Sequence, residues 1–354
     1  MRIVVAPDKF KGSLSAREAA EAISAGLRQR FPVAELVTVP IADGGEGTMA
    51  LISEVLGAQE VGLVATGPNG DLVEAGYALA GRRAIIEMSA ASGLQLVPAD
   101  RRDPWEADTF GTGELIADAI GSGADEIIVG IGGSATNDGG AGMARALGFE
   151  FQLDGDGRLA RIVPPPERPG DRARFVAACD VANPLLGLDG CTRIYGPQKG
   201  ISRDDFLRHE RRLGRLAEVV RADVAKVSPE AAGAGAAGGL GFGLMAFCGA
   251  ELRSGFDLVA ELTGLEEKIA AADLVVTGEG SLDEQTLMGK GPAGVAELAR
   301  AAGKRVVAMC GVAKDERALL SRFDAVVSLE GLADGVEDSI SRAAELLAEA
   351  AMEL

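Results

Sequence analysis

The chain has 354 residues, 47% of them hydrophobic and 25% charged, which is long enough for two packed hydrophobic cores. Its formal net charge of −18 argues against binding to nucleic acid or to an anionic membrane surface, because both depend on clustered Lys and Arg. We therefore expect small-molecule partners. An anionic substrate remains compatible with this charge, since acidic bulk does not exclude one local basic pocket.

The cysteines and the amino-terminal segment predict a cytoplasmic protein. The four cysteines lie far apart and lack the C-x-x-C spacing of structural zinc sites, which favours free thiols in a reducing compartment. The first nine residues contain no apolar core of a signal peptide. The uncharged stretch 231–250 is rich in Gly and Ala, so a glycine-rich loop leading into a buried helix is favoured over a membrane span. The sequence predicts no oligomeric state.

Short β-branched runs alternate with helical patterns at both ends of the chain. Near-continuous apolar runs are typical of strands buried on both faces of a parallel sheet. They occur at 2–6, 35–39, 273–277, 305–309 and 325–329. Helices are predicted from Ser15, which has Glu18 at capping-box spacing, after Gly47, after a second capping pair Thr263 and Glu266, from Pro292, and over 336–352. This alternation predicts a doubly wound, flavodoxin-like sheet.

The long interval in the middle of the chain predicts a second domain. Residues 60–255 contain their own strand candidates at 84–88, 126–130 and 174–178, among helices and glycine-rich turns. The predicted fold class is therefore α/β, with a flavodoxin-like parallel-sheet domain (1–59 and 256–354) interrupted by a second inserted α/β domain (60–255). The topology of the insertion is not predicted.

Polar and glycine-rich segments follow the predicted strands, where ligands of open parallel sheets bind. They are 8–13, 42–47 and 278–283. Lysines neutralise phosphate oxygens, glycine-rich backbone cradles them, and carboxylates hold Mg²⁺. Lys9 and Lys11 precede one helix, and Lys290 precedes the helix at Pro292. Each lysine alone is typical of a solvated surface, but their convergence favours phosphoryl transfer.

The glycine-rich segment 130–140 allows another interpretation. It follows a predicted strand and nearly matches the dinucleotide-binding fingerprint, with Ala135 at the last glycine position and Glu150 at a plausible distance. A nicotinamide-dependent oxidoreductase of a small hydroxy acid is therefore an alternative. The segment 233–238 matches the same fingerprint, but no strand is predicted before it, and close helix packing explains its glycines equally well.

The single histidine, His209, restricts the possible mechanisms. It lies in a charged helical segment, where we interpret it as a solvated side chain. One histidine excludes a site with several histidine ligands, and its surroundings argue against a Ser-His-Asp hydrolase. The general base is then a carboxylate.

Taken together, these motifs resemble the type I glycerate kinases nearly end to end. The matching segments are 8–14, 42–48, 130–140, 179–185, 196–200 and 277–280 with Asp283. The resemblance implies ATP, Mg²⁺, D-glycerate and an active site in the cleft between the two domains. Family activity is usually assigned as formation of 2-phosphoglycerate, although older naming left the position ambiguous. A ligand-sensing domain without chemistry is the non-enzymatic alternative.

On this resemblance we assign roles as hypotheses. Asp180 is the base that takes the glycerate hydroxyl proton, with Asp8, Asp138 and Asp283 as competitors. Lys9, Lys11, Lys290 and Lys199, placed in a tight turn, bind carboxylate or phosphate. Asp43, Glu279 and Asp283 hold the metal. The remaining predicted contacts to substrate or phosphate are Gly12, Ser13, Gly132, Gly133, Ser134, Thr136, Asn137, Asn183, Gln198 and Gly280.

Overall fold

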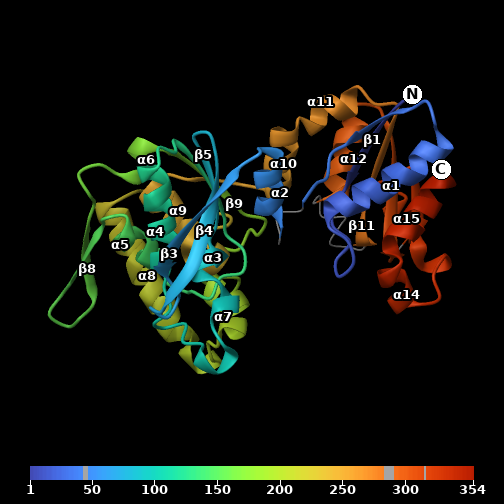
Figure 1. Cartoon of the computed structure of the whole chain (residues 1–354). Helices are drawn as coiled ribbons and strands as arrows, with labels where there is room; N and C mark the ends of the chain where they lie inside the picture. Colours follow the sequence, from blue (N-terminus) through green and yellow to red (C-terminus); the bar gives the residue numbers. More distant parts are fainter. Residues whose placement is uncertain (43–46, 283–290, 315) are drawn as a thin grey trace. The chain divides into compact units, whose positions relative to one another are not determined.

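The computed structural model describes residues 1–42, 47–282, 291–314 and 316–354, and it divides into two compact units (Figure 1). Unit 1 comprises Met1–Asp43 and Gly255–Leu354, and unit 2 comprises Gly44–Ser254. The insertion therefore begins earlier than the predicted residue 60. The reason is helix α2 (Thr48–Val55), which packs against β4 (Leu72–Ala80) and β5 (Arg83–Glu87) of unit 2.

The sheet of unit 1 has five parallel strands in the order β2-β1-β11-β12-β13. The strands are β1 (Arg2–Pro7), β2 (Glu35–Thr38), β11 (Leu274–Leu282), β12 (Arg305–Ala313) and β13 (Ala325–Ser328). Counted within the unit, this is the 2-1-3-4-5 order of flavodoxin-like folds. The predicted fold class is confirmed.

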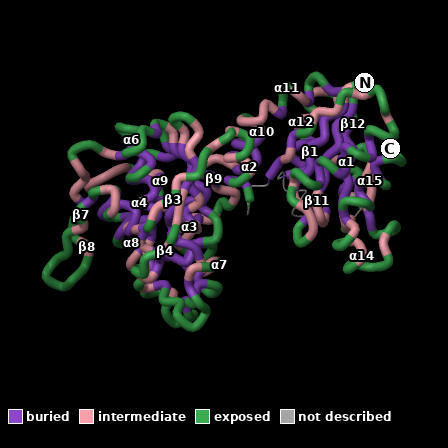
Figure 2. The backbone as a smooth tube through the Cα atoms, in the orientation of Figure 1, coloured by how far each residue is buried: buried purple, intermediate pink, exposed green. Residues whose placement is uncertain are grey.

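Helices cover both faces of this sheet, which is why its central strands β1, β11 and β12 are buried at most positions (Figure 2). Ile3 and Val5 of β1 pack towards α1 (Ala16–Arg30) and α15 (Ala343–Met352). Val4 and Ala6, with the alternate orientation, pack towards the other face. That face carries α10 (Gly255–Thr263), α11 (Leu265–Ala270) and α12 (Pro292–Ala301). The unit also contains α13 (Glu316–Leu319), α14 (Val336–Ser341) and the 3₁₀ turn η5 (Leu329–Gly331).

Local signals placed some helix ends correctly and others wrongly. The capping box of Ser15 and Glu18 starts α1, and Pro292 is the first residue of α12, as predicted. The capping box predicted at Thr263 is wrong, because its hydroxyl donates back to the Val259 carbonyl at 2.7 Å at the end of α10. The closing helix predicted over 336–352 is two helices, α14 and α15, separated at Arg342.

The sheet of unit 2 has six strands in the order β10-β9-β6-β5-β4-β3. The new strands are β3 (Gln59–Thr66), β6 (Glu126–Gly130), β9 (Arg174–Ala178) and β10 (Glu251–Arg253). Strands β5, β6, β9 and β10 are parallel, whereas β3 and β4 are antiparallel. A separate hairpin consists of β7 (Glu150–Leu153) and β8 (Leu159–Val163).

Helices and short turns complete unit 2 around one hydrophobic core. The helices are α3 (Ser89–Ser92), α4 (Phe110–Gly121), α5 (Ala141–Ala146), α6 (Pro169–Arg172), α7 (Cys191–Lys199), α8 (Phe206–Asp223) and α9 (Ala236–Cys248). The 3₁₀ turns are η1 (Leu94–Leu96), η2 (Ala99–Arg101) and η3 (Arg203–Asp205). Helix α9 is buried and follows a glycine-rich loop, as predicted. Over the described ranges, no helix combines the length and apolar character needed to cross a membrane.

Candidate active site

In unit 1 the predicted residues meet at the carboxyl ends of β1 and β11. The strand order reverses between these two strands, and open α/β sheets bind ligands at such a switch point. The Asp8 amide donates to the Gly278 carbonyl at 2.8 Å, so the loop after β1 lies along the end of β11. A Cβ atom on Gly280 would lie only 3.1 Å from the backbone nitrogen of Lys11. The structure thus brings together Lys11, Gly12, Ser13 and Gly280.

The loop after β1 presents its polar groups in different ways. Lys11 and Gly12 are exposed, and Gly12 has a left-handed φ of 83°. Lys9 is half-buried, with its ammonium 3.9 Å from the Asp8 carboxylate. Asp8 itself is only 3% exposed and accepts a hydrogen bond from the Lys9 amide at 2.6 Å. Lys11 is therefore the lysine of this loop that is most open to an anionic ligand.

A cavity of about 350 Å³ opens beside this loop. Lys11, Ser13 and Gly280 contribute to its wall, together with residues at the ends of β11 and β12 and on α14. A volume of this size lies within the ~300–1,000 Å³ range of small-molecule sites. The cavity and the switch point therefore lie at the same edge of the sheet, where ligands of open α/β sheets bind.

The predicted metal ligands are represented by Glu279 alone. Glu279 is half-buried on β11 and lies opposite Cys310 of β12 in the sheet register. Burial raises the pKa of the Cys310 thiol to about 12, and the negative charges of Glu279 and Glu330 contribute to this rise. Asp43, Asp283 and Lys290 lie outside the described residues. Within the described ranges, no three His, Cys, Asp or Glu side chains are grouped closely enough to hold a metal ion.

In unit 2 the loop after β6 is held in place by backbone hydrogen bonds to residues 92–94. The Leu94 amide donates to the Gly133 carbonyl at 2.8 Å, and the Ala135 amide donates to the Ser92 carbonyl at 3.0 Å. Gly132 and Gly133 are exposed, whereas Ser134, Thr136 and Asn137 are buried. The loop therefore exposes the backbone of its glycines, while the residues that follow them are buried.

Lys199 lies beneath this loop. It is 2% exposed, and its Nζ donates to Ser134 Oγ at 2.8 Å and to the Thr136 carbonyl at 2.7 Å. Burial lowers the pKa of Lys199 to about 8, although the charges of Cys191 and Asp138 oppose this shift. The tight turn predicted around Lys199 is wrong: the lysine ends helix α7, and only Gly200, with a φ of 102°, makes the turn.

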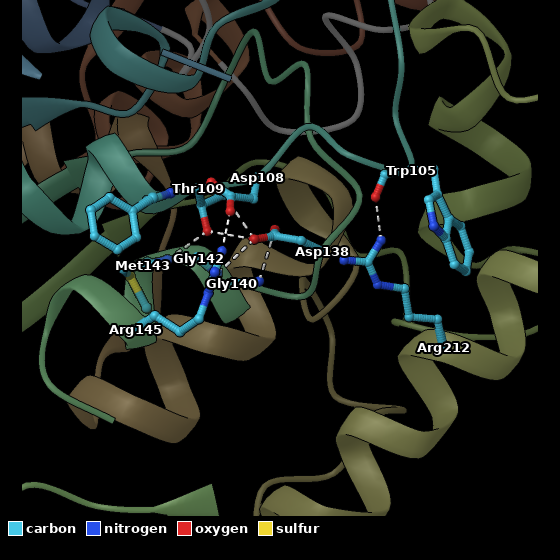
Figure 3. Close-up of polar contacts among 10 residues, drawn as sticks. Trp105, Asp108, Thr109, Asp138, Gly140, Gly142, Met143, Arg145 and Arg212 are labelled. Atoms are coloured by element: carbon cyan, nitrogen blue, oxygen red, sulfur yellow. Dashed lines mark hydrogen bonds and ion pairs between the residues drawn. The ribbon is translucent and has the colours of Figure 1, made fainter. Parts of the chain in front are cut away.

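Asp138 anchors the end of the same loop (Figure 3). One carboxylate oxygen accepts from the Thr109 amide at 3.0 Å, the Thr109 hydroxyl at 2.8 Å and the Gly142 amide at 2.9 Å. The other accepts from the Gly140 amide at 3.1 Å. Because Asp138 is 2% exposed and its two oxygens accept four hydrogen bonds, its position favours a structural role over that of a base.

The prediction of a solvated His209 is wrong. The side chain is 3% exposed, its Nδ1 lies 3.3 Å from Asn137 Nδ2, and its ring meets Trp105 edge-on at 5.2 Å. The Asn137 amide also donates to Thr192 Oγ1 at 3.1 Å. Helical spacing could have revealed this position, since His209 shares the buried stripe of α8 with Leu213, Leu216 and Val220.

The remaining predicted residues of unit 2 follow β9 or lie on α7. Asp180 is half-buried, two residues beyond the end of β9. The amide of Asn183 is held on both sides: its Oδ1 accepts from the Tyr195 hydroxyl at 2.6 Å, and its Nδ2 donates to the Asp189 carbonyl at 2.9 Å. Gln198 is exposed. Sequence reasoning missed the supporting residues Trp105, Thr109 and Tyr195, for which no local motif exists.

The dinucleotide interpretation of segment 130–140 finds no support in this geometry. That fingerprint needs a helix that begins at its glycines and points its amino terminus at the pyrophosphate. Here helix α5 begins only at Ala141, and the buried residues Ser134 to Asp138 fill the space between. In segment 233–238, a Cβ atom on Gly235 or Gly238 would collide with backbone, so close packing explains these glycines.

Comparisons with known proteins agree with one another over the whole chain. The model of the "Glycerate kinase family" matches residues 3–354. A glycerate 2-kinase of Escherichia coli is 44% identical, with 98% of this chain and 97% of that protein covered, and a glycerate kinase of Bacillus subtilis is 41% identical, with 100% and 97% covered. A crystal structure from Salmonella typhimurium LT2, assigned as a glycerate kinase 2, superposes with a TM-score of 0.87 at 42% identity, covering 100% of this chain and 96% of that one. The chain belongs to the glycerate kinase family.

Proposed function

We propose that this protein transfers the γ-phosphoryl group of ATP to the 2-hydroxyl of D-glycerate. The observation that carries the proposal is the family match over residues 3–354, which coincides with a lysine- and glycine-containing loop at the switch point of a flavodoxin-like sheet. The name of the Escherichia coli relative, glycerate 2-kinase, supports the position of transfer.

Unit 1 supplies the groups for the phosphates of ATP. Lys11 is exposed beside Gly12, and the loop leads into the amino terminus of α1, where peptide dipoles favour an anion. Lys9 and Ser13 belong to the same loop. Carboxylate oxygens are the ligands that Mg²⁺ prefers, and Asp43, Glu279 and Asp283 would hold this ion, which neutralises phosphate charge when bound.

Unit 2 supplies the groups for glycerate. Asp180 takes the proton of the 2-hydroxyl while the oxygen of that hydroxyl forms its bond to the γ-phosphorus and the bond from phosphorus to the ADP oxygen breaks. The exposed backbone of Gly132 and Gly133 binds the anionic substrate, and the buried Lys199 holds the loop and adds positive charge beneath it.

A substrate panel tests the proposal directly. ADP release is measured with D-glycerate, glycolate, lactate and hydroxypyruvate, and the phosphorylated carbon is identified by NMR of the product. We expect turnover with D-glycerate and attachment at C2. ATP binding without turnover would instead support a ligand sensor, and an absorbance change with a nicotinamide cofactor would support an oxidoreductase.

Two substitutions test the roles of the charged groups. Asp180→Asn is expected to lower kcat by about 100-fold or more with little change in the KM for either substrate, because only the proton acceptor is lost. Lys11→Ala is expected to weaken binding of the nucleotide. Asp156→Asn, on the exposed hairpin of β7 and β8, is the matched control. A folded Asp180→Asn enzyme with near-normal kcat would contradict the assignment.

We further propose that the protein acts in the cytoplasm. All four cysteines lie in the described part of the chain, and each is a thiol rather than half of a disulfide. This supports a reducing compartment. In a reducing buffer at cytoplasmic pH, we expect the protein to retain its activity. A thiol titration of the same sample is expected to count all four cysteines as free thiols.

A further inference from the structure

We propose that the cavity of unit 1 binds the purine base and ribose of the nucleotide, an inference that rests on the proposed use of ATP. The cavity of about 350 Å³ lies at the carboxyl ends of β11 and β12, and residues of η5, α14 and the start of α15 also line it. All of its lining residues belong to unit 1. The proposal therefore depends on the geometry of one unit only.

The charges along the cavity define how a nucleotide would lie in it. Lys11 lines the cavity at the loop after β1, whereas Glu330 lines it after β13, at the edge of the sheet. Strands β11 and β12 lie between these two positions. Phosphates are attracted to Lys11 and repelled by Glu330. The nucleotide would thus extend across the strand ends, with its phosphates at β1 and its base near β13 and α14.

The far end of the cavity has the apolar character that a base requires. Val336 and Ile340 of α14 line it, yet they are 71% and 46% exposed. Large apolar side chains that gather at the mouth of a cavity often mark a ligand site. A flat purine ring would cover them, whereas the small, anionic glycerate molecule would leave them in water.

Glycines and one hydroxyl complete the fit. Gly280 and Gly311 lie on neighbouring strands, and a Cβ atom on Gly311 would lie 2.6 Å from the Gly280 carbonyl. The two strands therefore approach too closely here for a side chain at Gly311, so this part of the cavity wall consists of backbone. Ser281 also lines the cavity, and its buried Oγ has no hydrogen-bond partner in the described part of the chain. A nucleoside offers both donors and acceptors to such a hydroxyl.

Variants of the apolar end test the proposal. Ala333→Trp fills the cavity, and Ile340→Asp places a carboxylate beside the expected base. Leu332→Ala is the matched control, because Leu332 is 47% exposed in the same segment but does not line the cavity. Binding of ATP, adenosine and inorganic tripolyphosphate to the full chain is measured by calorimetry, together with the KM for ATP and for glycerate.

The expected result is a loss of about tenfold or more in affinity for ATP and adenosine in both cavity variants. Tripolyphosphate affinity in Ala333→Trp, the KM for glycerate and every property of Leu332→Ala should change by less than about twofold, within the usual effect of surface substitutions. A folded Ala333→Trp variant with unchanged ATP and adenosine affinity would overturn the inference. So would a rise in the KM for glycerate with an unchanged KM for ATP, since the cavity would then hold the acceptor.

These results separate the inference from the proposed function. Adenosine binding is an equilibrium measurement that needs no turnover. If the wild-type chain phosphorylates glycerate and the cavity variants bind nucleotide as tightly as the wild type does, the inference alone is overturned. A chain that binds adenosine in the cavity but phosphorylates no substrate would overturn the proposed function and leave the nucleoside site supported.

Discussion

The loop after β1 in unit 1 and the loop after β6 in unit 2 differ in how their lysines are placed. Both are glycine-containing and follow the carboxyl end of a parallel strand. In the first loop the lysine side chain, Lys11, is exposed; in the second, Lys199 is buried beneath the backbone. The first loop therefore offers charge to a ligand directly. The second is held in place by buried hydrogen bonds, so that its exposed glycine backbone is already positioned before a ligand binds.

The largest effect is expected for Asp138→Ala, which removes the anchor of the second loop. Its carboxylate accepts four hydrogen bonds from buried or partly buried donors of Thr109, Gly140 and Gly142. Unpaired buried donors cost ~1–3 kcal/mol each, so the free energy of unfolding should fall by about 4 kcal/mol or more. Urea denaturation measures this change. Asp156→Ala, at an exposed site of the same unit, should leave it nearly unaltered.

Lys199→Met is expected to lower kcat/KM by about 100-fold, because the loop loses its central cation. In the wild type, kcat/KM should decline as the pH rises through about 8, where Lys199 loses its proton. The free energy of unfolding should rise with pH between about 8 and 10.5, since the unfolded chain then binds more protons than the folded one. A Lys199→Met variant that keeps this part of the stability profile would contradict the assignment.

His209→Phe tests the support behind the second loop at a smaller cost. The change leaves Asn137 Nδ2 with one acceptor fewer in a buried site. We expect a loss of about 1–2 kcal/mol in the free energy of unfolding and a decrease in kcat larger than any change in KM. Arg211→Ala, on the exposed face of the same helix, is the control. Equal stability of His209→Phe and the wild type would show that this contact contributes nothing.

Glycine substitutions give the smallest contrast between the two loops. Gly12 has a φ of 83°, and apart from its two chain neighbours no atom of the described residues lies within 4 Å of the place that a Cβ would occupy. Gly12→Ala therefore costs only backbone strain, about 1 kcal/mol. Gly132 has equally open surroundings and no left-handed φ, so Gly132→Ala should change stability by less than about 0.5 kcal/mol. Thermal unfolding of the two variants side by side measures the difference. An equal loss of stability in Gly12→Ala and Gly132→Ala would contradict this prediction.

The fold of unit 1 could be predicted closely because its signals are local. Apolar runs mark the strands, Ser15 with Glu18 marks the start of α1, and Pro292 marks the start of α12. Errors arose where local chemistry allowed two outcomes. The Thr263 hydroxyl bonded back into the preceding helix, and α2 joined unit 2 because its apolar face packs on β4 and β5. The choice of packing partner depends on residues distant in sequence.

For the candidate site, the sequence alone determined which residues follow the strands and which chemistry they suit, because a parallel sheet gathers its strand ends at one edge. Helical spacing could have indicated the burial of His209, but only the tertiary structure decided the hydrogen-bond partners of the side chains. Lys199 and His209 are polar residues in helices, and nothing local reveals that Ser134 and Asn137 meet them in the interior. Burial and hydrogen-bond partners are set by packing between segments far apart in the chain, and these determine pKa and rigidity.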